Sequence, residues 1–405
     1  MRKHMKKKAT AVLLAAAVAF GLAGCGAAAA GTSEGSGNTQ AGSAAPEGSG
    51  KSKGTIKLGL VAPVTGVHAE YGQGFQAATQ IAVDELNGAG GVNGYQLVIE
   101  VKDSAADPKT SADMVTQFCE DDDIKAVIGD FTSGACMADA PIVDEYGCVL
   151  ISPTASNPDY APMSEYCFST MYNQADKAPW VAKSVIGKFM GLDKIAVMYL
   201  NTDWGISTNQ HLVDALKEAG IEVMADESYE EMETDFSSVI AKLKASGAEA
   251  VCILDQGNVP SIINQIKASG WNPKMVTEGP GASQQLLDLC GANAEGLIVS
   301  DSSYITPDNP VTKDFYEKFF AMNKTAPTDH ALCAYNAVQM LAIAIEKTGD
   351  GEITREAIKD NLKDAAYDGM AGRLTFDENG GGVRQFLLLG VEGGKYVIEE
   401  DYGFE

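Results

Sequence analysis

The sequence predicts an α/β protein built as two doubly wound lobes, and three observations lead to this prediction. From Thr55 onward, apolar segments typical of strands alternate with amphipathic segments typical of helices, with a recurrence of roughly 25–30 residues. The alternation begins again after about residue 176. A tail then departs from it, with three successive helical segments followed by three short strands. Such alternation is typical of mostly parallel sheets that helices cover on both faces.

The first lobe is expected to begin at residue 55 and to run to residue 176. Its strands are predicted at Ile56–Val61, Tyr95–Val101, Ala126–Gly129 and Val149–Ile151. Its helices are predicted at Gly72–Leu86, from Asp107-Pro108 onward, and at Ala135–Tyr146. Asp107 is suited to the N-cap of its helix and Pro108 to the first turn.

The second lobe is expected over residues 177–303. Its strands are predicted at Ile195–Tyr199, Glu222–Tyr229, Ala250–Leu254, Lys274–Thr277 and Leu297–Ser300. Its helices are predicted at Asp176–Met190, Gly205–Ala219, Phe236–Ala245, Val259–Ala268 and Gln284–Leu289.

The C-terminal tail is expected to complete both lobes. Its helices are predicted at Val311–Met322, Ala331–Thr348 and Thr354–Leu362, and its strands at Leu374–Phe376, Gln385–Leu389 and Tyr396–Glu399. We assign residues 304–372 to the N-terminal lobe and residues 373–405 to the C-terminal lobe. Several crossings between two lobes make a hinge.

The N-terminus carries the pattern of an export signal. A basic segment over residues 1–8 precedes the short apolar run Thr10–Leu22, which predicts a signal peptide over residues 1–24. The sequence Leu22-Ala-Gly-Cys25 resembles a bacterial lipobox, so Cys25 is predicted to be lipidated and to become the mature N-terminus; the alternative is an ordinary signal peptide with a chance cysteine. Residues 25–54 are nearly all small or polar, which predicts a lipid-anchored flexible linker.

Composition excludes several classes of function. The net charge is −25, and removal of the positively charged leader makes it about −30, which argues against nucleic acid as a partner. The seven cysteines after Cys25 form no C-x-x-C pair and no mixed cluster with histidine, so no metal site is expected. No nucleophile, base and acid can be grouped by position, and no cofactor motif stands in the right order of elements. The sequence therefore favours a binding protein over an enzyme.

Two loops within residues 126–158 are predicted to form an anion site. Each follows an apolar strand, and strands joined by a helix place their following loops at the same carboxyl edge of the sheet. Both loops carry hydroxyl groups, and the first leads directly into a helix N-terminus, which favours negative charge. A carboxylate is the kind of group that such an edge would hold.

The chain resembles the solute-binding lipoproteins of branched-chain amino acid ABC transporters, the leucine/isoleucine/valine-binding type of periplasmic binding protein, over residues 55–405. The resemblance depends on the order and spacing of several stretches rather than on any one of them. They are Ile56–Tyr71 with Gly66 and Ala69-Glu-Tyr-Gly72, Asn87–Gly94, Asp103 through Asp107-Pro108, Val127-Ile-Gly129 with Thr132-Ser133, Ile151–Ser156, Thr234-Asp235-Phe236, Ala294–Leu297, Tyr335 with Ala337, and Gly372–Asp377.

The resemblance implies the type 1 periplasmic-binding-protein fold, in which two lobes flank a central ligand cleft and the chain crosses between them three times. It further implies that the ligand carboxylate meets Ser133, the backbone of Thr154, and Ser156. The alternative is that Ser133 and Ser156 only cap helices and turns.

For the ligand ammonium, the resemblance implies an acid in the loop after Lys274–Thr277, where Glu278 is the natural candidate. A gapless alignment, however, places Gly279 at the position of the family acid. Asp203 and Asp255, each just past a strand of the second lobe, are the alternatives, and each of the three acids could equally be a solvated loop carboxylate.

The side-chain pocket is expected to be apolar and aromatic. Tyr71 matches the family's Ala-x-Tyr-Gly position, and Trp204 stands where relatives usually have tyrosine before glycine. Trp204 could form a stacking wall, or it could pack against its own helix. Gln256 stands where relatives often have tyrosine, which leaves the identity of the ligand open.

The resemblance implies an extracytoplasmic, membrane-anchored lipoprotein, monomeric and not an enzyme. Such a protein captures an amino acid, of the branched-chain or a related hydrophobic type, and delivers it to the permease of an ABC importer. The alternatives are a binding protein for another small carboxylate, an amide or a urea-like solute, and a ligand sensor that works with a membrane receptor. An exported enzyme is the remaining, third class.

Overall fold

The computed structural model describes residues 52–278 and 282–402, and the side chains up to residue 399. The predicted signal peptide, Cys25 and nearly all of the linker lie outside the described residues. Within the described ranges, no helix is both long and apolar enough to cross a membrane.

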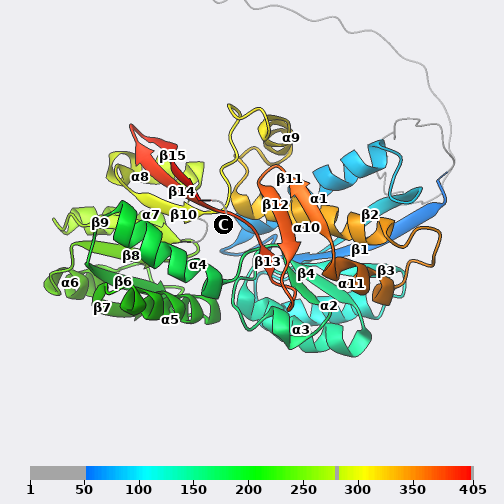
Figure 1. Cartoon of the computed structure of the whole chain (residues 1–405), viewed down its shortest axis with the longest axis horizontal. Coiled ribbons are helices and arrows are strands. Elements are labelled where there is room, and N and C mark those ends of the chain that lie inside the picture. Colours follow the sequence, from blue (N-terminus) through cyan, green and yellow to red (C-terminus); the bar gives the residue numbers. More distant parts are fainter. Residues whose placement is uncertain (1–51, 279–281, 403–405) are drawn as a thin grey trace, which may run out of the picture. The chain divides into compact units, whose positions relative to one another are not determined.

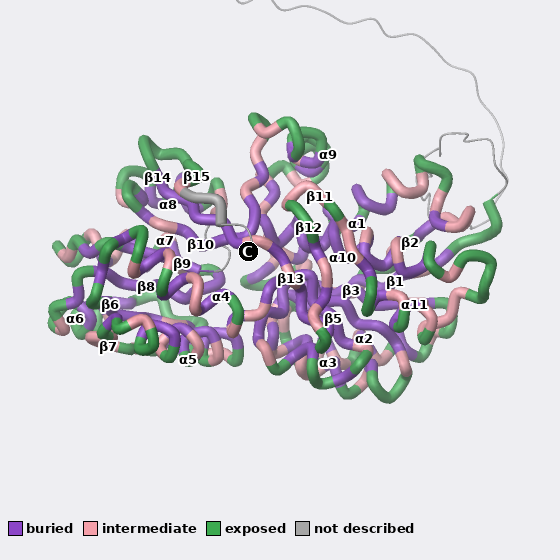
Figure 2. The backbone as a smooth tube through the Cα atoms, viewed as in Figure 1, coloured by how far each residue is buried: buried purple, intermediate pink, exposed green. Residues whose placement is uncertain are grey.

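The first lobe is built on a sheet of five parallel strands in the order β2-β1-β3-β4-β5 (Figure 1). The strands are β1 (Gly54–Ala62), β2 (Tyr95–Asp103), β3 (Ile124–Ile128), β4 (Val149–Ser152) and β5 (Cys167–Ser169). Both faces of the central strands are buried, as Figure 2 shows, which explains why they read as continuous apolar runs in the sequence.

Helices from two separate parts of the sequence cover this sheet. They are α1 (Ala69–Gly88), α2 (Pro108–Cys119), α3 (Ser133–Tyr146), α9 (Lys313–Asn323), α10 (Asp329–Glu346) and α11 (Arg355–Lys363). Buried residues of α1, α9, α10 and α11 share one core cluster with the sheet, and those of α2 and α3 share another. The late helices of the tail therefore complete the lobe that the early strands begin.

The second lobe is built on a seven-stranded sheet in the order β15-β14-β10-β9-β8-β6-β7, in which β6 to β10 are parallel and β14 and β15 are antiparallel. The strands are β6 (Lys194–Leu200), β7 (Glu222–Tyr229), β8 (Ala250–Leu254), β9 (Lys274–Glu278), β10 (Ile298–Asp301), β14 (Phe386–Glu392) and β15 (Lys395–Tyr402). Helices pack on both faces of this sheet. They are α4 (Gln174–Trp180), the π-helical segment η2 (Val181–Phe189), α5 (Asp203–Glu218), α6 (Ser237–Ala245), α7 (Val259–Ala268) and α8 (Gln284–Cys290).

The α/β prediction is confirmed, and three local features differ from it. The single helix expected over residues 176–190 is divided into α4, which contains Pro179, and the π-helical η2, because proline lacks the N–H that a regular helix needs. The sequence missed β5 and β11 (Ala366–Gly369), which are too short to show a period of alternation. The strand β11 pairs with β12 (Gly372–Phe376), and β12 with β13 (Gly382–Val383), in a small third sheet.

The chain passes between the two lobes three times in the described residues: after β5, after β10 and after β13. From the sequence, the third crossing between the lobes was expected at residue 373. In the structure, Leu374 and Phe376 still belong to the first core, whereas Leu387 and Leu389 belong to the second. The polypeptide therefore returns to the second lobe about one strand later than residue 373.

A buried lysine joins two of these crossings. Lys177, fully buried, donates from Nζ to the hydroxyl of Tyr172 at 2.6 Å and to the carbonyl of Ser300 at 3.0 Å. Its Nζ also lies 3.6 Å from Oε2 of Glu278, which is likewise fully buried. Because an unpaired buried charge is strongly destabilising, each member of this ion pair holds the other in place.

A second buried ion pair connects the last crossing to α10. Arg384 donates from Nη2 to Oδ1 of Asp329 at 2.8 Å, and Ser302 of the second crossing donates to the other oxygen of the same carboxylate at 2.7 Å. Buried polar contacts thus connect the second crossing with each of the other two.

Close packing between α1 and the end of β1 gives a direct test of this architecture. A Cβ added at Gly72 would lie 2.2 Å from the carbonyl oxygen of Pro63, so we expect Gly72→Ala to lower the free energy of unfolding by about 1–3 kcal/mol. Gly74, in the same helix, has no atom nearer than 3.7 Å to an added Cβ, and Gly74→Ala should raise this free energy by about 0.5–1 kcal/mol. Urea unfolding followed by circular dichroism measures both, and equal shifts in the two variants would contradict the packing.

Candidate functional site

The two predicted loops meet at the carboxyl edge of the first sheet. The strands β3 and β4 pair in parallel, with Ile128 opposite Ile151, so the chain leaves both strands at the same level. Hydrogen bonds then join the loops: Ser152 Oγ donates to the carbonyl of Asp130 at 3.0 Å, and Thr154 Oγ1 donates to the carbonyl of Phe131 at 2.6 Å. The loops therefore form one rigid unit.

The three residues predicted to hold a carboxylate, Ser133, Thr154 and Ser156, are all part of this unit and are buried. Ser133 is the first residue of α3, and its Oγ accepts from the backbone N–H of Asn157 at 3.3 Å. The N-cap of α3 is Thr132, so Ser133 does not itself cap the helix. The backbone N–H of Thr154 donates to Ser152 Oγ at 3.2 Å, which gives this predicted ligand contact an internal partner.

Trp204 brings the second lobe into contact with these loops. It lies in the first turn of α5, and its Nε1 donates to Oγ of Ser156 at 3.0 Å. Ser156 Oγ also accepts from Nε2 of Gln174 at 3.4 Å. The ring of Trp204 belongs at the same time to the core cluster of its own helix, so the two expectations for this residue, wall and core, are compatible.

A cluster of aromatic rings lies in the first lobe beside the loops. Of its members, the sequence analysis had singled out only Tyr71. The ring of Tyr71 stacks on Phe131 with centroids 4.5 Å apart and planes 5° from parallel. The ring centroids of His68 and His330 lie 5.0 and 6.0 Å from the ring centroid of Phe131. Burial lowers the pKa of His330 to about 4, so its imidazole is neutral near neutral pH. His68 was recognisable only by its place before the Ala-x-Tyr-Gly match.

His68 also contacts the second lobe. Its Nε2 lies 3.0 Å from Oε1 of Glu231, a residue in the loop after β7. The hydrogen bond to His68 lowers the pKa of Glu231. With the contact between Trp204 and Ser156, this pair makes a second polar contact between the lobes.

The three acids proposed for the ligand ammonium lie in different surroundings. Glu278 ends β9 and is fully buried beside Lys177; burial raises the pKa of its carboxyl, and the charge of Lys177 opposes that rise. Asp255 is also fully buried and accepts from the hydroxyl of Tyr229 at 2.8 Å and the N–H of Gly257 at 2.6 Å. Asp203 is exposed in the first turn of α5. The role of each toward a ligand stays a prediction.

Two neighbouring cavities lie between the lobes. The smaller, of about 130 Å³, has Glu70 and Tyr71 on the first lobe and Gln256, Val259 and other residues on the second. The remaining lining residues of this cavity are Val67, Gly257, Pro260, Ser283, Gln285, Leu286 and Leu289. Tyr71 and Gln256 are thus brought together, as the resemblance implied, whereas Ser133, Ser156, Trp204 and Glu278 are not among the lining residues.

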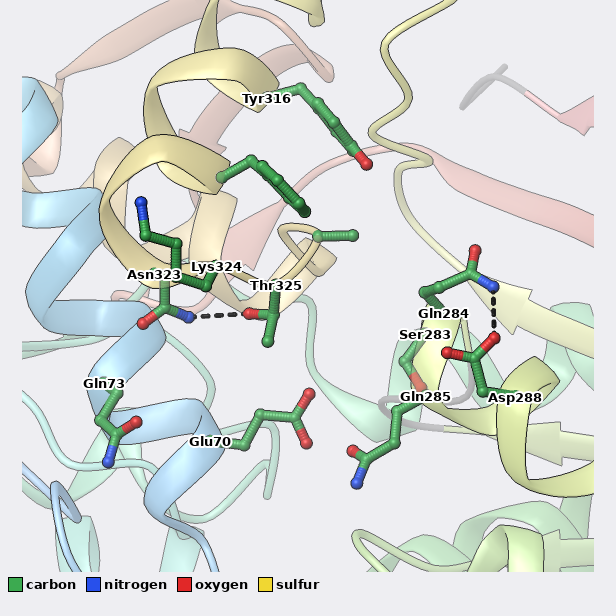
Figure 3. A pocket seen from close by; sticks show the side chains of 12 residues that line it. Glu70, Gln73, Ser283, Gln284, Gln285, Asp288, Tyr316, Asn323, Lys324 and Thr325 are labelled. Carbon is green, nitrogen blue, oxygen red and sulfur yellow. Dashed lines mark hydrogen bonds between the residues drawn. The ribbon is translucent and has the colours of Figure 1, made fainter. Parts of the chain in front are cut away.

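The larger cavity, of about 600 Å³, is shown in Figure 3. Its walls come from α1, from α8 with the preceding Ser283, and from α9 with the segment that follows it, and they are rich in amide and hydroxyl groups. Glu70, Ser283 and Gln285 line both cavities. The two cavities therefore share one wall on each lobe.

The described residues contain no group of three or more His, Cys, Asp or Glu side chains placed to hold a metal ion. The seven cysteines of the described chain are all free and buried. They act as small apolar side chains.

Comparison with known proteins agrees with this geometry. A family model described as periplasmic binding protein matches residues 55–395. The leucine-, isoleucine-, valine-, threonine- and alanine-binding protein of Pseudomonas aeruginosa is 30% identical over 332 residues, which cover 80% of this chain and 87% of that protein.

Solved structures show the same fold. A branched-chain amino acid transporter substrate-binding protein of Streptococcus pneumoniae in complex with isoleucine matches with a TM-score of 0.77 at 24% identity, over 86% of this chain and 99% of that one. A solute-binding protein of an R. palustris ABC transporter in complex with benzoate matches with a TM-score of 0.78 at 20% identity, over 86% and 96% of the chains.

These matches confirm the fold and the family that the sequence motifs implied. They identify the protein as an extracytoplasmic solute-binding protein and not an enzyme. From its sequence, its two-lobed fold and its relatives, the chain belongs to the periplasmic binding protein family, in the group that resembles the leucine/isoleucine/valine-binding proteins.

Proposed function

We propose that this protein captures an amino acid, of the branched-chain or a related hydrophobic type, between its two lobes and delivers it to an ABC importer. The observation that carries the proposal is the joined pair of hydroxyl-bearing loops at the edge of the first sheet, which the second lobe contacts through Trp204. A carboxylate is common to all amino acids, and buried hydroxyls beside a helix N-terminus suit it.

The ligand contacts in this proposal are those that the sequence motifs suggested. Ser133, Ser156 and the backbone of Thr154 hold the carboxylate, and Tyr71, Trp204 and Gln256 surround the side chain. Their support is the burial of the loop residues and the position of Tyr71 and Gln256 on opposite walls of one cavity. Glu278, Asp203 and Asp255 remain the candidates in the second lobe for the ammonium.

The remaining parts of the proposal concern the whole chain. The lobes comprise residues 55–176 and 304 onward for the first, and residues 177–303 with the C-terminal strands for the second. A lipid on Cys25 and the linker hold the monomer at the membrane, where its partner is the permease. The leucine-type relative and the isoleucine-bound structure support transport as the purpose.

A second candidate ligand class, an aromatic carboxylate, is favoured by the ring cluster. Tyr71 stacked on Phe131 offers an aromatic surface beside the carboxylate loops, and a structure of the same fold holds benzoate. Aromatic pairs favour offset-stacked and edge-to-face contacts, so a ligand ring could extend this cluster.

A ligand panel tests the proposed function. We expect at least one compound among the twenty amino acids, 4-methylpentanoate and benzoate to raise the melting temperature, because a ligand that binds only the folded state at 100 times its Kd adds about 2.7 kcal/mol of stability. Differential scanning fluorimetry of the purified protein measures the shift. A panel without any stabilising compound would contradict the proposal.

Substitution of the loop serines tests the carboxylate site. Ser133→Ala and Ser156→Ala should each weaken binding of the compound that the panel selects by about 1–3 kcal/mol, because each leaves a buried charged group short of a hydrogen bond. Isothermal titration calorimetry gives the affinities. Ser238→Ala, on the exposed surface of α6, serves as the control and should bind like the wild type. Unchanged affinity in both loop variants would show that the carboxylate binds elsewhere.

A further inference from the structure

Glu70 is an acid of the first lobe that faces the second lobe across both cavities. It lies in the first turn of α1, which follows the N-cap residue His68. Figure 3 shows its carboxylate extending from α1 into the space toward Gln285 of α8. Apart from Ser283 and Gln285, no other described residue lines both cavities.

This carboxylate has no protein partner in the described residues. It makes no hydrogen bond and no ion pair with them, although Glu70 is partly buried, and this burial raises the pKa of its carboxyl. Lys324, the one lysine that lines the larger cavity, donates its Nζ to the carbonyl of Ala321 at 2.5 Å instead. A partly desolvated carboxylate without a counter-charge is unfavourable unless a cation reaches it.

Two of the three acids proposed for the ammonium are already engaged, and the third, Asp203, is exposed and lines neither cavity. Glu278 is paired with Lys177, and the carboxylate of Asp255 accepts hydrogen bonds from Tyr229 and from two backbone N–H groups. An acid in a first helical turn also complements the helix dipole, which would account for Glu70 by itself. The dipole does not, however, require the carboxylate to be enclosed between two lobes, and most first-turn acids are exposed.

We propose that Glu70 contacts the ligand and accepts a cationic nitrogen, of an ammonium or a guanidinium group, when the lobes close on it. This inference rests on the proposed function and narrows it to ligands that carry both a carboxylate and a cation. Glu70 holds the positive end of the ligand. The loops at Ser133 and Ser156, which line neither cavity, hold the negative end beside Phe131, whose ring stacks on Tyr71 in the wall of the smaller cavity. The neutral side chains of Gln256 and Gln285 line the smaller cavity from the second lobe.

A paired comparison of ligands and variants tests this inference. The panel of amino acids, 4-methylpentanoate and benzoate is titrated against wild type, Glu70→Gln and Asp84→Asn. Asp84 is an exposed acid of the same helix that accepts from Gln80, so Asp84→Asn changes the net charge equally outside the cavities. The tightest ligand of the wild type should carry a cationic nitrogen, Glu70→Gln should weaken it about tenfold to a hundredfold, and Asp84→Asn should not.

The ligand series distinguishes an α-ammonium group from a side-chain cation as the group that contacts Glu70. Loss of binding in 4-methylpentanoate, together with weakened leucine binding in Glu70→Gln, assigns Glu70 to the α-ammonium. Selective binding of arginine or lysine, lost in Glu70→Gln, assigns it to a distal cation. Either pattern supports the inference.

The pH dependence of binding gives a readout that a purely structural role would not produce. Because the pKa of Glu70 is raised in the free protein and a ligand cation would lower it, binding should release a proton, and affinity should fall as pH drops through the range just above the ordinary value for glutamate. The other ionisable side chains that line the two cavities are Tyr71, Asp288, Tyr316 and Lys324. Glu70→Gln should remove this pH dependence, and Asp84→Asn should keep it.

Two results would overturn the inference alone: a tightest ligand without a cationic nitrogen, or a Glu70→Gln variant that binds as tightly as the wild type. A panel without any ligand would overturn the proposed function, and the inference with it. The unliganded melting temperature of Glu70→Gln shows that the variant is folded.

Discussion

The parallel pairing of β3 with β4 is the constraint on which the rest of the site depends. It places the ends of both strands at one edge of the sheet, and the hydroxyls of Ser152 and Thr154 then donate to carbonyl groups of the loop after β3. A shift of this register would separate Ser133 from Asn157 and would leave Trp204 without Ser156 as an acceptor. The second lobe can therefore close on a surface that is already formed.

Several contacts between the lobes near the site are polar, in contrast to the apolar cores of the lobes themselves. Trp204 donates to Ser156, and His68 pairs with Glu231. Polar contacts of this kind can be exchanged for water when lobes separate, which is what ligand-driven closure requires. At the crossings, by contrast, Lys177 and Arg384 are buried with their acidic partners, and losing one member of such a pair is strongly destabilising.

The sequence predicted the parts of this structure that depend on local pattern. Alternating apolar and amphipathic segments predicted the α/β class, and strand–loop–helix spacing placed the two loops at one edge of the sheet. The family resemblance then pointed to Ser133, Thr154 and Ser156 within them. Motif order gave the family, which the comparisons confirm. The signal peptide, the lipid on Cys25 and the ligand contacts stay predictions.

What the sequence could not provide depends on contacts between distant segments. Nothing local indicates that Lys177 lies beside Glu278, or that Phe131 is stacked by Tyr71. In the sequence, Glu70 is an ordinary acid in the first turn of a helix. Only the structure shows that it lines two cavities between the lobes. The short strands β5 and β11 form because neighbouring strands pair with them, which no periodicity within three or four residues can reveal.

A crystal structure of the protein with the solute that it retains through purification would test the central claim most directly. We expect a ligand carboxylate within hydrogen-bond distance of the hydroxyls of Ser133 and Ser156, with the second lobe closed over it at Trp204. A ligand whose carboxylate is bound by the second lobe, or a ligand that does not touch the loops after β3 and β4, would contradict this account.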